Sequence, residues 1–367
     1  MDNTIPKRIL AINKDNYSTN NGGHVVTQRN LAFLRKVFNE SNVDLITIGK
    51  ANFKSRIGNF LFNSSYGDLS NYKRFFKKGL SSNYLFAFID GSLEGTIVRE
   101  LASKGIRTIV FYHNIEYNYY KDLFKTNPSF SSFLMKRYSC RQEYLSTKYS
   151  TWRIVLNERD SNELYSIYNT KADMIFPTSF DDSVLRKNDT ISQTSIQEPY
   201  SLFVGSDFFA NVHGLSWYIN NVLPYVNVKL VVAGTISETI SKTYLDNSKL
   251  LCLGYVEDLG SLYKNAAFIV SPIFLGSGLK TKTVEALMYS KSIFGTTESF
   301  QGITGDYSKI GALCNSADDF INAINRFDYS SQDYKTNLYS KQIFDNNYSH
   351  TTAFHKFCEF LQTNKLI

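Results

Sequence analysis

Short runs of apolar residues recur along the chain and alternate with longer stretches of helical periodicity. In the first half these runs cover residues 9–12, 43–48, 85–89, 108–112, 152–156 and 172–177. Apolar runs of this length, separated by helices, are typical of strands in a parallel sheet that helices cover on both faces. The helical pattern is clearest at residues 24–38 and 92–104.

The same pattern restarts after residues 188–199, which are polar and without periodicity, as in a linker. Further strands are predicted at 201–204, 229–234, 250–254, 267–272 and 292–295, with helices at about 212–221 and 281–289. The tail from about residue 332 is helical and aromatic. The 367 residues therefore predict two doubly wound α/β domains. We place the first at 1–195 and the second at 198–345, with a C-terminal helix at 346–367 that packs back on the first domain.

Composition indicates a globular protein of a reducing compartment. The apolar fraction is 43%, the charged fraction is 20%, and no apolar run reaches the length of a membrane span. The start of the sequence lacks the apolar segment of a signal peptide. The four cysteines lie far apart, so we expect free thiols and a cytoplasmic location.

The excess of positive over negative charge is confined to the first half of the chain. Residues 1–197 carry 27 Lys and Arg against 18 Asp and Glu, whereas residues 198–367 carry 13 against 15. This asymmetry suits contact with a phosphorylated ligand or an anionic membrane, and it is equally explained by solubility alone.

The segment 276–287 carries the clearest chemical signal, because it follows a predicted strand and opens a predicted helix. Glycines at 276 and 278 let the backbone approach a ligand, and the free amides of a helix start bind anions. Lys280 adds a positive charge at this turn, and Glu285 could accept hydrogen bonds from ribose hydroxyls. A plain turn with both side chains in solvent is the alternative, and the combination favours a nucleoside diphosphate site.

This segment resembles the nucleotide-binding signature of GT-B glycosyltransferases of family four (glycosyl transferases group 1), in the subset with the pattern G-S-G-L-K-x-K-x-x-E-A-L. Other stretches of the second half are similar to that family: residues 203–206, 211–217, 232–234, 254–259, 262–266 and 295–302. The resemblance implies a GT-B fold, with two Rossmann-like domains facing a cleft. It also implies transfer of a sugar from a nucleotide sugar to a hydroxyl of a saccharide or lipid-linked saccharide, with retention and without metal or other cofactor, in bacterial surface polysaccharide synthesis.

The resemblance also implies roles for individual residues. Lys280 would bind the donor diphosphate, Glu285 the ribose, and Tyr255 with Val256 the base. The other donor-binding residues that it implies are Gly22, Gly23, Ser206, Asn211, Gly234, Ser277, Gly278 and Leu279. The catalytic candidates are His113, Lys280 and Glu285.

Two positions depart from the pattern of many family members. Ser277 stands where they carry a first glutamate, although serine is usual in this subset, and His213 stands where they carry a lysine. A neutral imidazole neutralises a diphosphate poorly, so we expect phosphate binding to depend on Lys280 and on helix amides.

The first half resembles the family at fewer positions. Gly22 and Gly23 lie where members carry a glycine loop, and His113-Asn114-Ile115-Glu116 follows a strand and is similar to an H-N-x-E pattern. His113 could contact a sugar hydroxyl, or it could be a structural histidine. We interpret the strand-to-helix turn at Asp90–Gly95 mainly as a helix N-cap, with a role in ligand binding as the alternative. Arg159 could reach a phosphate or lie in solvent.

Residues 71–80 interleave basic and aromatic side chains. Such a segment could lie on an anionic membrane at the inner face of the plasma membrane, or its aromatic residues could point into the core. No nucleic-acid motif accompanies it, so no nucleic-acid partner is expected.

The sequence lacks the residue patterns of metal sites and of serine-hydrolase active sites. The five histidines form no H-x-x-x-H pair, no Asp-x-Asp follows a strand, and there is no G-x-S-x-G turn. Two alternatives to a transferase stay open, a nucleotide-sugar epimerase of the same fold and a non-catalytic nucleotide-sugar-binding subunit.

Overall fold

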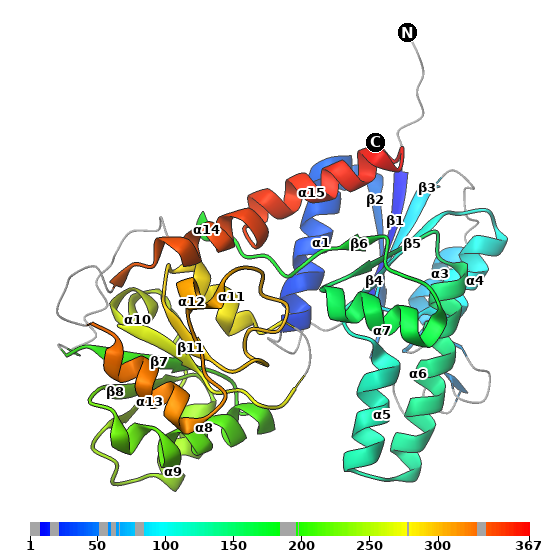
Figure 1. Cartoon of the computed structure of the whole chain (residues 1–367). Coiled ribbons are helices and arrows are strands. Elements are labelled where there is room, and N and C mark those ends of the chain that lie inside the picture. Colours follow the sequence, from blue (N-terminus) through cyan, green and yellow to red (C-terminus); the bar gives the residue numbers. More distant parts are fainter. Residues whose placement is uncertain are drawn as a thin grey trace. The chain divides into compact units, whose positions relative to one another are not determined.

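The computed structural model describes residues 8–14, 22–50, 58–59, 64–65, 67–77, 84–183, 196, 198–276, 279–328 and 335–367. The chain divides into two compact units, Met1–Pro177 with Phe354–Ile367, and Thr178–Ala353 (Figure 1). Each unit contains one six-stranded parallel sheet with helices on both faces, which is the doubly wound arrangement that the apolar pattern predicts.

The sheet of the first unit has the strand order β2-β1-β3-β4-β5-β6. Its strands are β1 (Arg8–Lys14), β2 (Val43–Ile48), β3 (Tyr84–Asp90), β4 (Thr108–Tyr112), β5 (Trp152–Val155) and β6 (Met174–Ile175). All pairs between neighbours are parallel, so every strand ends at the same edge of the sheet. The chain passes from β1 outward to β2 and then returns to the other side of β1 at β3. This reversal makes a topological switch point between β1 and β3.

Alternate residues of these strands face two layers of helices. The helices of the first unit are α1 (Gly22–Phe38), η1 (Glu40–Asn42), α3 (Ser70–Lys77), α4 (Gly95–Ser103), α5 (Glu116–Thr126), α6 (Phe130–Tyr149) and α7 (Glu158–Tyr168). Leu10 and Ile12 pack in one core cluster with α4 and α7 side chains. On the other face, Phe38 of α1 contacts Phe86 of β3 with ring centroids 5.6 Å apart.

The sheet of the second unit has the order β12-β11-β10-β7-β8-β9. Its strands are β7 (Tyr200–Val204), β8 (Lys229–Ala233), β9 (Leu250–Cys252), β10 (Phe268–Ser271), β11 (Ile293–Gly295) and β12 (Gly311–Leu313). All of its pairs are parallel, and the switch point lies between β7 and β10.

Two core clusters cover the two faces of this second sheet. The helices are α8 (Phe209–Asn221), η3 (Leu223–Tyr225), α9 (Ile236–Thr243), α10 (Gly260–Asn265), α11 (Thr281–Met288), α12 (Tyr307–Ile310), α13 (Ala317–Arg326) and α14 (Leu338–Asn347). Phe203 belongs to the cluster with α8, α9 and α13, and its neighbour Leu202 belongs to the cluster with α10, α11 and α14. Because successive side chains of a strand point to opposite faces of the sheet, these two neighbouring residues belong to different clusters.

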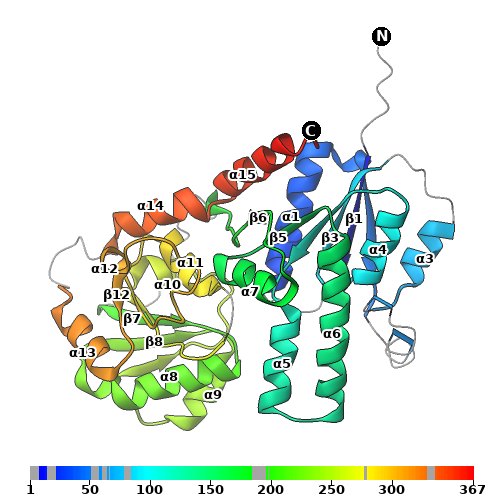
Figure 2. The ribbon, with the colours of Figure 1, turned by 45° about the vertical axis from the view of Figure 1, so that its right-hand side comes forward.

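The last helix, α15 (His350–Thr363), begins in the second unit and continues into the first (Figure 2). Phe354 and Phe357 contact Phe33 of α1, with ring centroids 5.3 and 6.3 Å apart. Just beyond the helix, Asn364 accepts a hydrogen bond of 2.7 Å from the Trp152 indole. Through these contacts the aromatic residues of the C-terminal helix pack on the first unit.

The turn at Asp90–Gly95 supplies the N-cap residue of the following helix, although without a capping side chain. Helix α4 begins at Gly95, and its N-cap residue Glu94 makes no side-chain capping bond. Gly91, with φ of +144°, turns the chain directly after β3, so the helix starts later than the sequence pattern indicated.

The aromatic residues of the 71–80 run pack inward where the structure describes them. Tyr72 is buried and donates a hydrogen bond of 2.9 Å to Glu100, while Phe75 and Phe76 pack against the same core cluster as β1. This supports the interpretation in which the rings belong to the core. Residues 78–80 lie outside the described residues.

Candidate functional site

Parallel sheets bind ligands beyond the carboxyl ends of their strands, at the switch point. In the second unit this is the edge between β7 and β10, and helix α11 begins nearby. Lys280 is the N-cap residue of α11 and supplies no side-chain cap, so its ammonium group is available for other contacts. Its Nζ lies 2.6 Å from Oε1 of Glu298, and its side chain is only 12% exposed.

Lys282 is a second cation at this edge, which the sequence analysis did not single out. Its Nζ donates to Oδ1 of Asn211 at 2.5 Å and lies 4.4 Å from the ring centroid of Phe203. Burial, assisted by the nearby charge of Lys280, lowers the pKa of Lys282 to about 7. The signal was present in the sequence as the second lysine of Lys280-Thr281-Lys282.

Glu285 lies one turn further along α11. It accepts a hydrogen bond of 3.1 Å from the Tyr263 hydroxyl through one oxygen, and burial raises the pKa of its carboxyl. The Tyr263 ring stacks on Tyr289 with centroids 4.8 Å apart, which fixes the hydroxyl that orients Glu285. The carboxyl is therefore held at the helix start by a buried partner.

The turns after β7, β8 and β9 approach one another through glycines. Gly234 has φ of +102°, and a Cβ on it would lie 2.1 Å from the carbonyl oxygen of Gly205. The Gly234 amide donates to the Gly254 carbonyl at 2.7 Å. A larger side chain at Gly234 would separate these turns, so the sheet edge is built for close backbone approach.

The remaining predicted residues of this unit lie on the same edge, except where they are outside the described residues. Asn211 Nδ2 donates to the Ser206 carbonyl at 2.9 Å. Tyr255 is 72% exposed directly after Gly254. The side chains of Val256 and Leu279 pack against the core. Ser277 and Gly278 lie outside the described residues.

The first unit has a polar pocket of about 260 Å³ at its own switch point. Its lining comes from the ends of β1, β3 and β4 and from the start of α1: Lys14, Gly23, Thr27, Asp90, Gly91, Ser92, His113, Asn114 and Glu116. The structure thus brings His113 and Gly23 together, and Gly22 is the first residue of α1. Arg159 does not line this pocket. Its Nε lies 3.9 Å from Oε1 of Glu163 on α7.

His113 is the last member of a buried hydrogen-bond chain. Arg29 Nη2 donates to Asn30 Oδ1 at 2.8 Å, and Asn30 Nδ2 donates to Asp90 Oδ1 at 3.0 Å. The same Asp90 oxygen lies 3.1 Å from His113 Nε2. Burial opposes ionisation of Asp90, yet His113 and these hydrogen bonds hold its pKa below the ordinary value. Sequence reasoning missed Arg29 and Asn30, because they look like ordinary polar positions of a helix.

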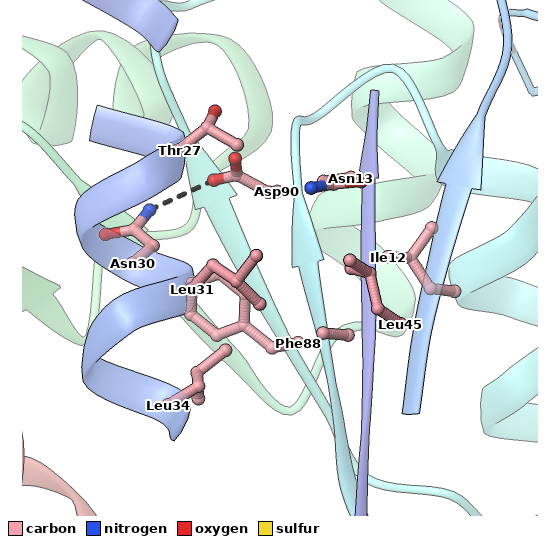
Figure 3. Close-up of a pocket in the computed structure, with 10 residues that line it drawn as sticks. Ile12, Asn13, Thr27, Asn30, Leu31, Leu34, Leu45, Phe88 and Asp90 are labelled. Carbon is pink, nitrogen blue, oxygen red and sulfur yellow. Dashed lines mark hydrogen bonds between the residues drawn. The ribbon is translucent and has the colours of Figure 1, made fainter. Parts of the chain in front are cut away.

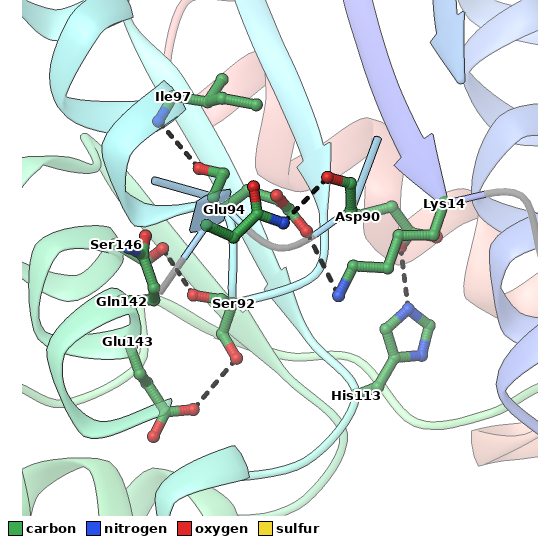
Figure 4. Close-up of polar contacts among 12 residues, drawn as sticks. Lys14, Asp90, Ser92, Glu94, Ile97, His113, Gln142, Glu143 and Ser146 are labelled. Atoms are coloured by element: carbon green, nitrogen blue, oxygen red, sulfur yellow. Dashed lines mark hydrogen bonds and ion pairs between the residues drawn. The ribbon is translucent and has the colours of Figure 1, made fainter. Parts of the chain in front are cut away.

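A second charged group lies on the opposite side of the β3 turn (Figure 4). Lys14 Nζ lies 3.2 Å from Oε1 of Glu94, whose side chain is 2% exposed. Burial raises the pKa of Glu94 and of Glu116, and the charge of Lys14 opposes the shift in both. Among the described residues that line this pocket, the carboxyl groups of Asp90 and Glu116 stand beside one lysine, Lys14. Such a lining favours hydroxyl groups over anions.

A cavity of about 10 Å³ lies beneath Asp90, between α1 and the sheet (Figure 3). Leu31, Leu34, Leu45 and Phe88 supply its apolar walls. A cavity of this size holds no more than a water molecule, so it is part of the packing and not a ligand site.

Within the described part of the chain, no helix combines the length and the apolar character that crossing a membrane requires. No three His, Cys, Asp or Glu side chains there gather in a group that could hold a metal ion. Metal independence stays a prediction.

The comparisons with known proteins agree with this geometry. Residues 198–327 match the family model of glycosyl transferases group 1. The structure is similar to sucrose-phosphate synthase from Thermosynechococcus elongatus, with a TM-score of 0.67 and 12% identity over 97% of this chain and 98% of that one. It is also similar to Anabaena Alr3699/HepE in complex with UDP, with a TM-score of 0.65 and 11% identity over 97% and 100% of the two chains.

One curated relative adds a genetic context. The chain is 23% identical over 318 residues to an uncharacterised 44.6 kDa protein from the cps region of Klebsiella pneumoniae, covering 73% of this chain and 75% of that protein. The fold is GT-B, with two Rossmann-like domains. Together with the group 1 match of the second unit, it supports a GT-B glycosyltransferase.

Proposed function

We propose that the protein is a retaining, metal-independent glycosyltransferase of family four. It transfers a sugar from a nucleoside diphosphate sugar to a hydroxyl of a saccharide or lipid-linked saccharide. The observation that carries this proposal is the group formed by Lys280, Lys282 and Glu285 at the start of α11, within the stretch that matches the group 1 family model. Two cations and a carboxyl beside a helix start suit a diphosphate and a ribose.

The donor diphosphate would replace carboxylate and amide partners that the two lysines now have. Lys280 is paired with Glu298 and Lys282 with Asn211, so each ammonium group is already held in place. Anions and cations in a partly buried site interact more strongly than in water. Glu285 would accept the ribose hydroxyls, and Tyr255 with Val256 would lie against the base.

The first unit would contribute recognition of sugar hydroxyls. His113 is oriented by Asp90, and the pocket around it is rich in carboxyl groups. Carboxylates and a histidine oriented in this way accept hydrogen bonds from hydroxyl groups. We assign His113 to a contact with the reacting sugar, and Gly22 and Gly23 to close approach of the backbone.

The reaction would be a displacement on one face of the sugar. The bond from the anomeric carbon to the diphosphate oxygen breaks, and a bond to the acceptor oxygen forms on the same face. The acceptor proton passes to the leaving diphosphate. Catalysis then depends on positioning and on stabilising the charge that grows on the diphosphate, which is the role of Lys280 and Lys282.

Two further parts of the proposal concern the setting. The relative from a cps region supports a place in the synthesis of a bacterial surface polysaccharide. Such synthesis uses lipid-linked acceptors, so we propose a cytoplasmic enzyme that works at the inner face of the plasma membrane.

A thermal-shift screen with UDP-, GDP-, dTDP- and ADP-sugars tests donor binding first, because a ligand of the folded state raises its melting temperature. The Anabaena neighbour was crystallised with UDP and with UDP-glucose, so these two ligands lead the screen. The donor that binds is then incubated with and without saccharide acceptors. Transfer with retained configuration supports the proposal. Release of an epimerised donor without acceptor would identify an epimerase, and binding without turnover a non-catalytic subunit.

A further inference from the structure

Two turns carry the polar side chains of the first-unit pocket. The turn after β3 holds Asp90 and Ser92, and the turn after β4 holds His113 and leads into α5 at Glu116. Both turns lie against helix α6, which contributes no residue to the pocket itself.

Glu143 of α6 contacts both turns at once. Its Oε1 accepts hydrogen bonds from the Glu116 amide at 2.9 Å and from the Ser92 hydroxyl at 3.0 Å. Its Oε2 accepts from the Tyr117 amide at 3.2 Å and from the Tyr168 hydroxyl at 2.9 Å. The side chain is completely buried, and each of its two oxygens accepts two hydrogen bonds.

The neighbours of Glu143 on α6 reinforce the same contacts (Figure 4). Ser146 donates to the Ser92 carbonyl at 2.7 Å. Gln142 accepts from the Thr96 amide at the start of α4 at 3.0 Å. A Cβ on Gly95 would lie 2.0 Å from the Gln142 carbonyl oxygen, so the backbones of α4 and α6 approach as closely as a glycine allows.

Helix α5 has no cap of its own. Its N-cap residue is Ile115, which makes no side-chain capping bond. Glu143 supplies the missing acceptor from another helix, and a negative charge at a helix N-terminus is favourable. The first turn of α5, and with it the preceding His113 turn, is therefore fixed by a residue about 30 positions further along the chain.

We propose that Glu143 is a positioning residue that holds the Asp90 turn and the His113 turn in register. It fixes the distance between Asp90 Oδ1 and His113 Nε2 without touching the substrate. Burying a carboxyl group in a protein interior costs free energy, and an apolar side chain of similar size would often pack equally well in its place. The four donors that converge on Glu143 thus indicate a role in geometry more than in stability. The effect on turnover rests on the proposed function, while the effect on the two turns does not.

The test compares Glu143→Gln with Asp160→Asn. Asp160 is also a buried carboxyl, near the start of α7, with a pKa that burial raises to about 7, and it contacts neither turn. Both changes are isosteric and remove one buried acid. Hydrogen exchange of the Glu116 and Tyr117 amides is followed by NMR in the full chain, with the amides of β4 as internal reference.

In Glu143→Gln we expect the Glu116 and Tyr117 amides to exchange at least about tenfold faster, because a single amide oxygen cannot serve both carboxylate positions. In the same variant kcat falls by about 10- to 100-fold, while KM for the donor changes less than about threefold, since a misplaced group costs rate and not donor binding. Asp160→Asn leaves both the exchange rates and kcat near the wild-type values.

The outcomes separate this proposal from the function. Unchanged exchange in Glu143→Gln, or equal losses of kcat in Glu143→Gln and Asp160→Asn, would overturn the positioning role. Faster exchange in a protein whose wild type transfers no sugar would leave the positioning role standing and overturn the proposed function. If Glu143→Gln does not fold, Ser92→Ala removes one of the four bonds, and there we expect a smaller loss of kcat with faster exchange at the same two amides.

Discussion

The Nζ of Lys280 lies 2.6 Å from Oε1 of Glu298, and both side chains are mostly buried. The cation that the family resemblance assigns to a diphosphate is thus paired with a carboxylate. A phosphate group that enters must compete with Glu298 or share the ammonium with it.

Replacing Lys280 with alanine tests the centre of the proposed function. We expect Lys280→Ala to lower kcat by about 100-fold or more, because it removes a donor to charge that develops on the leaving group. The melting temperature should stay close to that of the wild type. Glu298→Gln is the matched partner: it releases Lys280 from its carboxylate and should lower KM for the donor. Near-normal turnover in Lys280→Ala would contradict the assignment.

Lys282 predicts that donor binding takes up a proton. Burial lowers the pKa of Lys282 to about 7, so at pH 8 most of the molecules carry a neutral amine. A diphosphate favours the charged form, and binding should therefore raise this pKa and bind a fraction of a proton. Calorimetric titration with UDP at pH 8 in buffers of different ionisation enthalpy measures that uptake. It should disappear in Lys282→Met, and equal heats in all buffers for the wild type would disprove it.

Asp90 predicts an effect on rate without contact to the donor nucleotide. Asp90→Asn removes the charge that orients His113, and groups that orient a functional histidine typically matter about 10- to 100-fold. We expect a loss of kcat of that size, with KM for the donor nearly unchanged. Asn30→Asp is a useful companion, because it places a second carboxylate against Asp90 and should disrupt the same chain. A change confined to donor KM would argue against a role at the reacting sugar.

Two buried acids of the first unit predict how its stability depends on pH. Burial raises the pKa of Glu143 and of Asp160 to about 7 each, above the ordinary values of 4.5 and 3.8. Between the ordinary and the raised pKa of each acid, the folded state binds more protons than the unfolded state. The stabilisation that these two acids provide is therefore fully present near pH 4 and is lost as the pH rises through 7. The titratable groups that interact electrostatically with Glu143 are Glu116, Tyr168, Tyr112 and Cys140.

Denaturant unfolding at pH 5 and pH 8 measures this loss. In Trp217→Phe the remaining Trp152 reports on the first unit alone, because the chain has two tryptophans. The decrease in unfolding free energy between the two pH values should be smaller when Glu143→Gln or Asp160→Asn is added. An unaltered difference in both variants would mean that these acids do not titrate in that range.

Gly95 predicts a packing defect that can be measured without any substrate. A methyl group at this position would lie 2.0 Å from the Gln142 carbonyl oxygen, and the α4–α6 contact would have to open. Gly95→Ala should destabilise the first unit by about 1–3 kcal/mol, as overpacking usually does. Gly58→Ala is the control, because a Cβ there meets nothing within 4 Å. Gly105→Ala is less suitable, since its positive φ would add backbone strain.

The sequence pattern was sufficient for the two sheets. Apolar runs marked every strand except β12 (Gly311–Leu313), where Gly and Ala leave Leu313 as the one large apolar residue. The segment around Lys280 was recognised because its residues are adjacent in sequence. The first-unit site was recognised only in part: Arg29, Asn30, Asp90 and Glu143 come from three separate elements, and only folding brings them to His113. The basic excess of the first half gave no indication that the pocket itself is rich in acids.

The contact between Asp90 and His113 also decides which ring nitrogen is free to act. A neutral imidazole carries one N–H, and the carboxylate at 3.1 Å from Nε2 draws the proton to that atom. Nδ1 then carries the lone pair; this atom is buried and has no hydrogen-bond partner among the described residues. In this tautomer Nδ1 can only accept a hydrogen bond, so the ring has no further N–H to give to an oxyanion. The ring is thereby unsuited to stabilise negative charge on a leaving group.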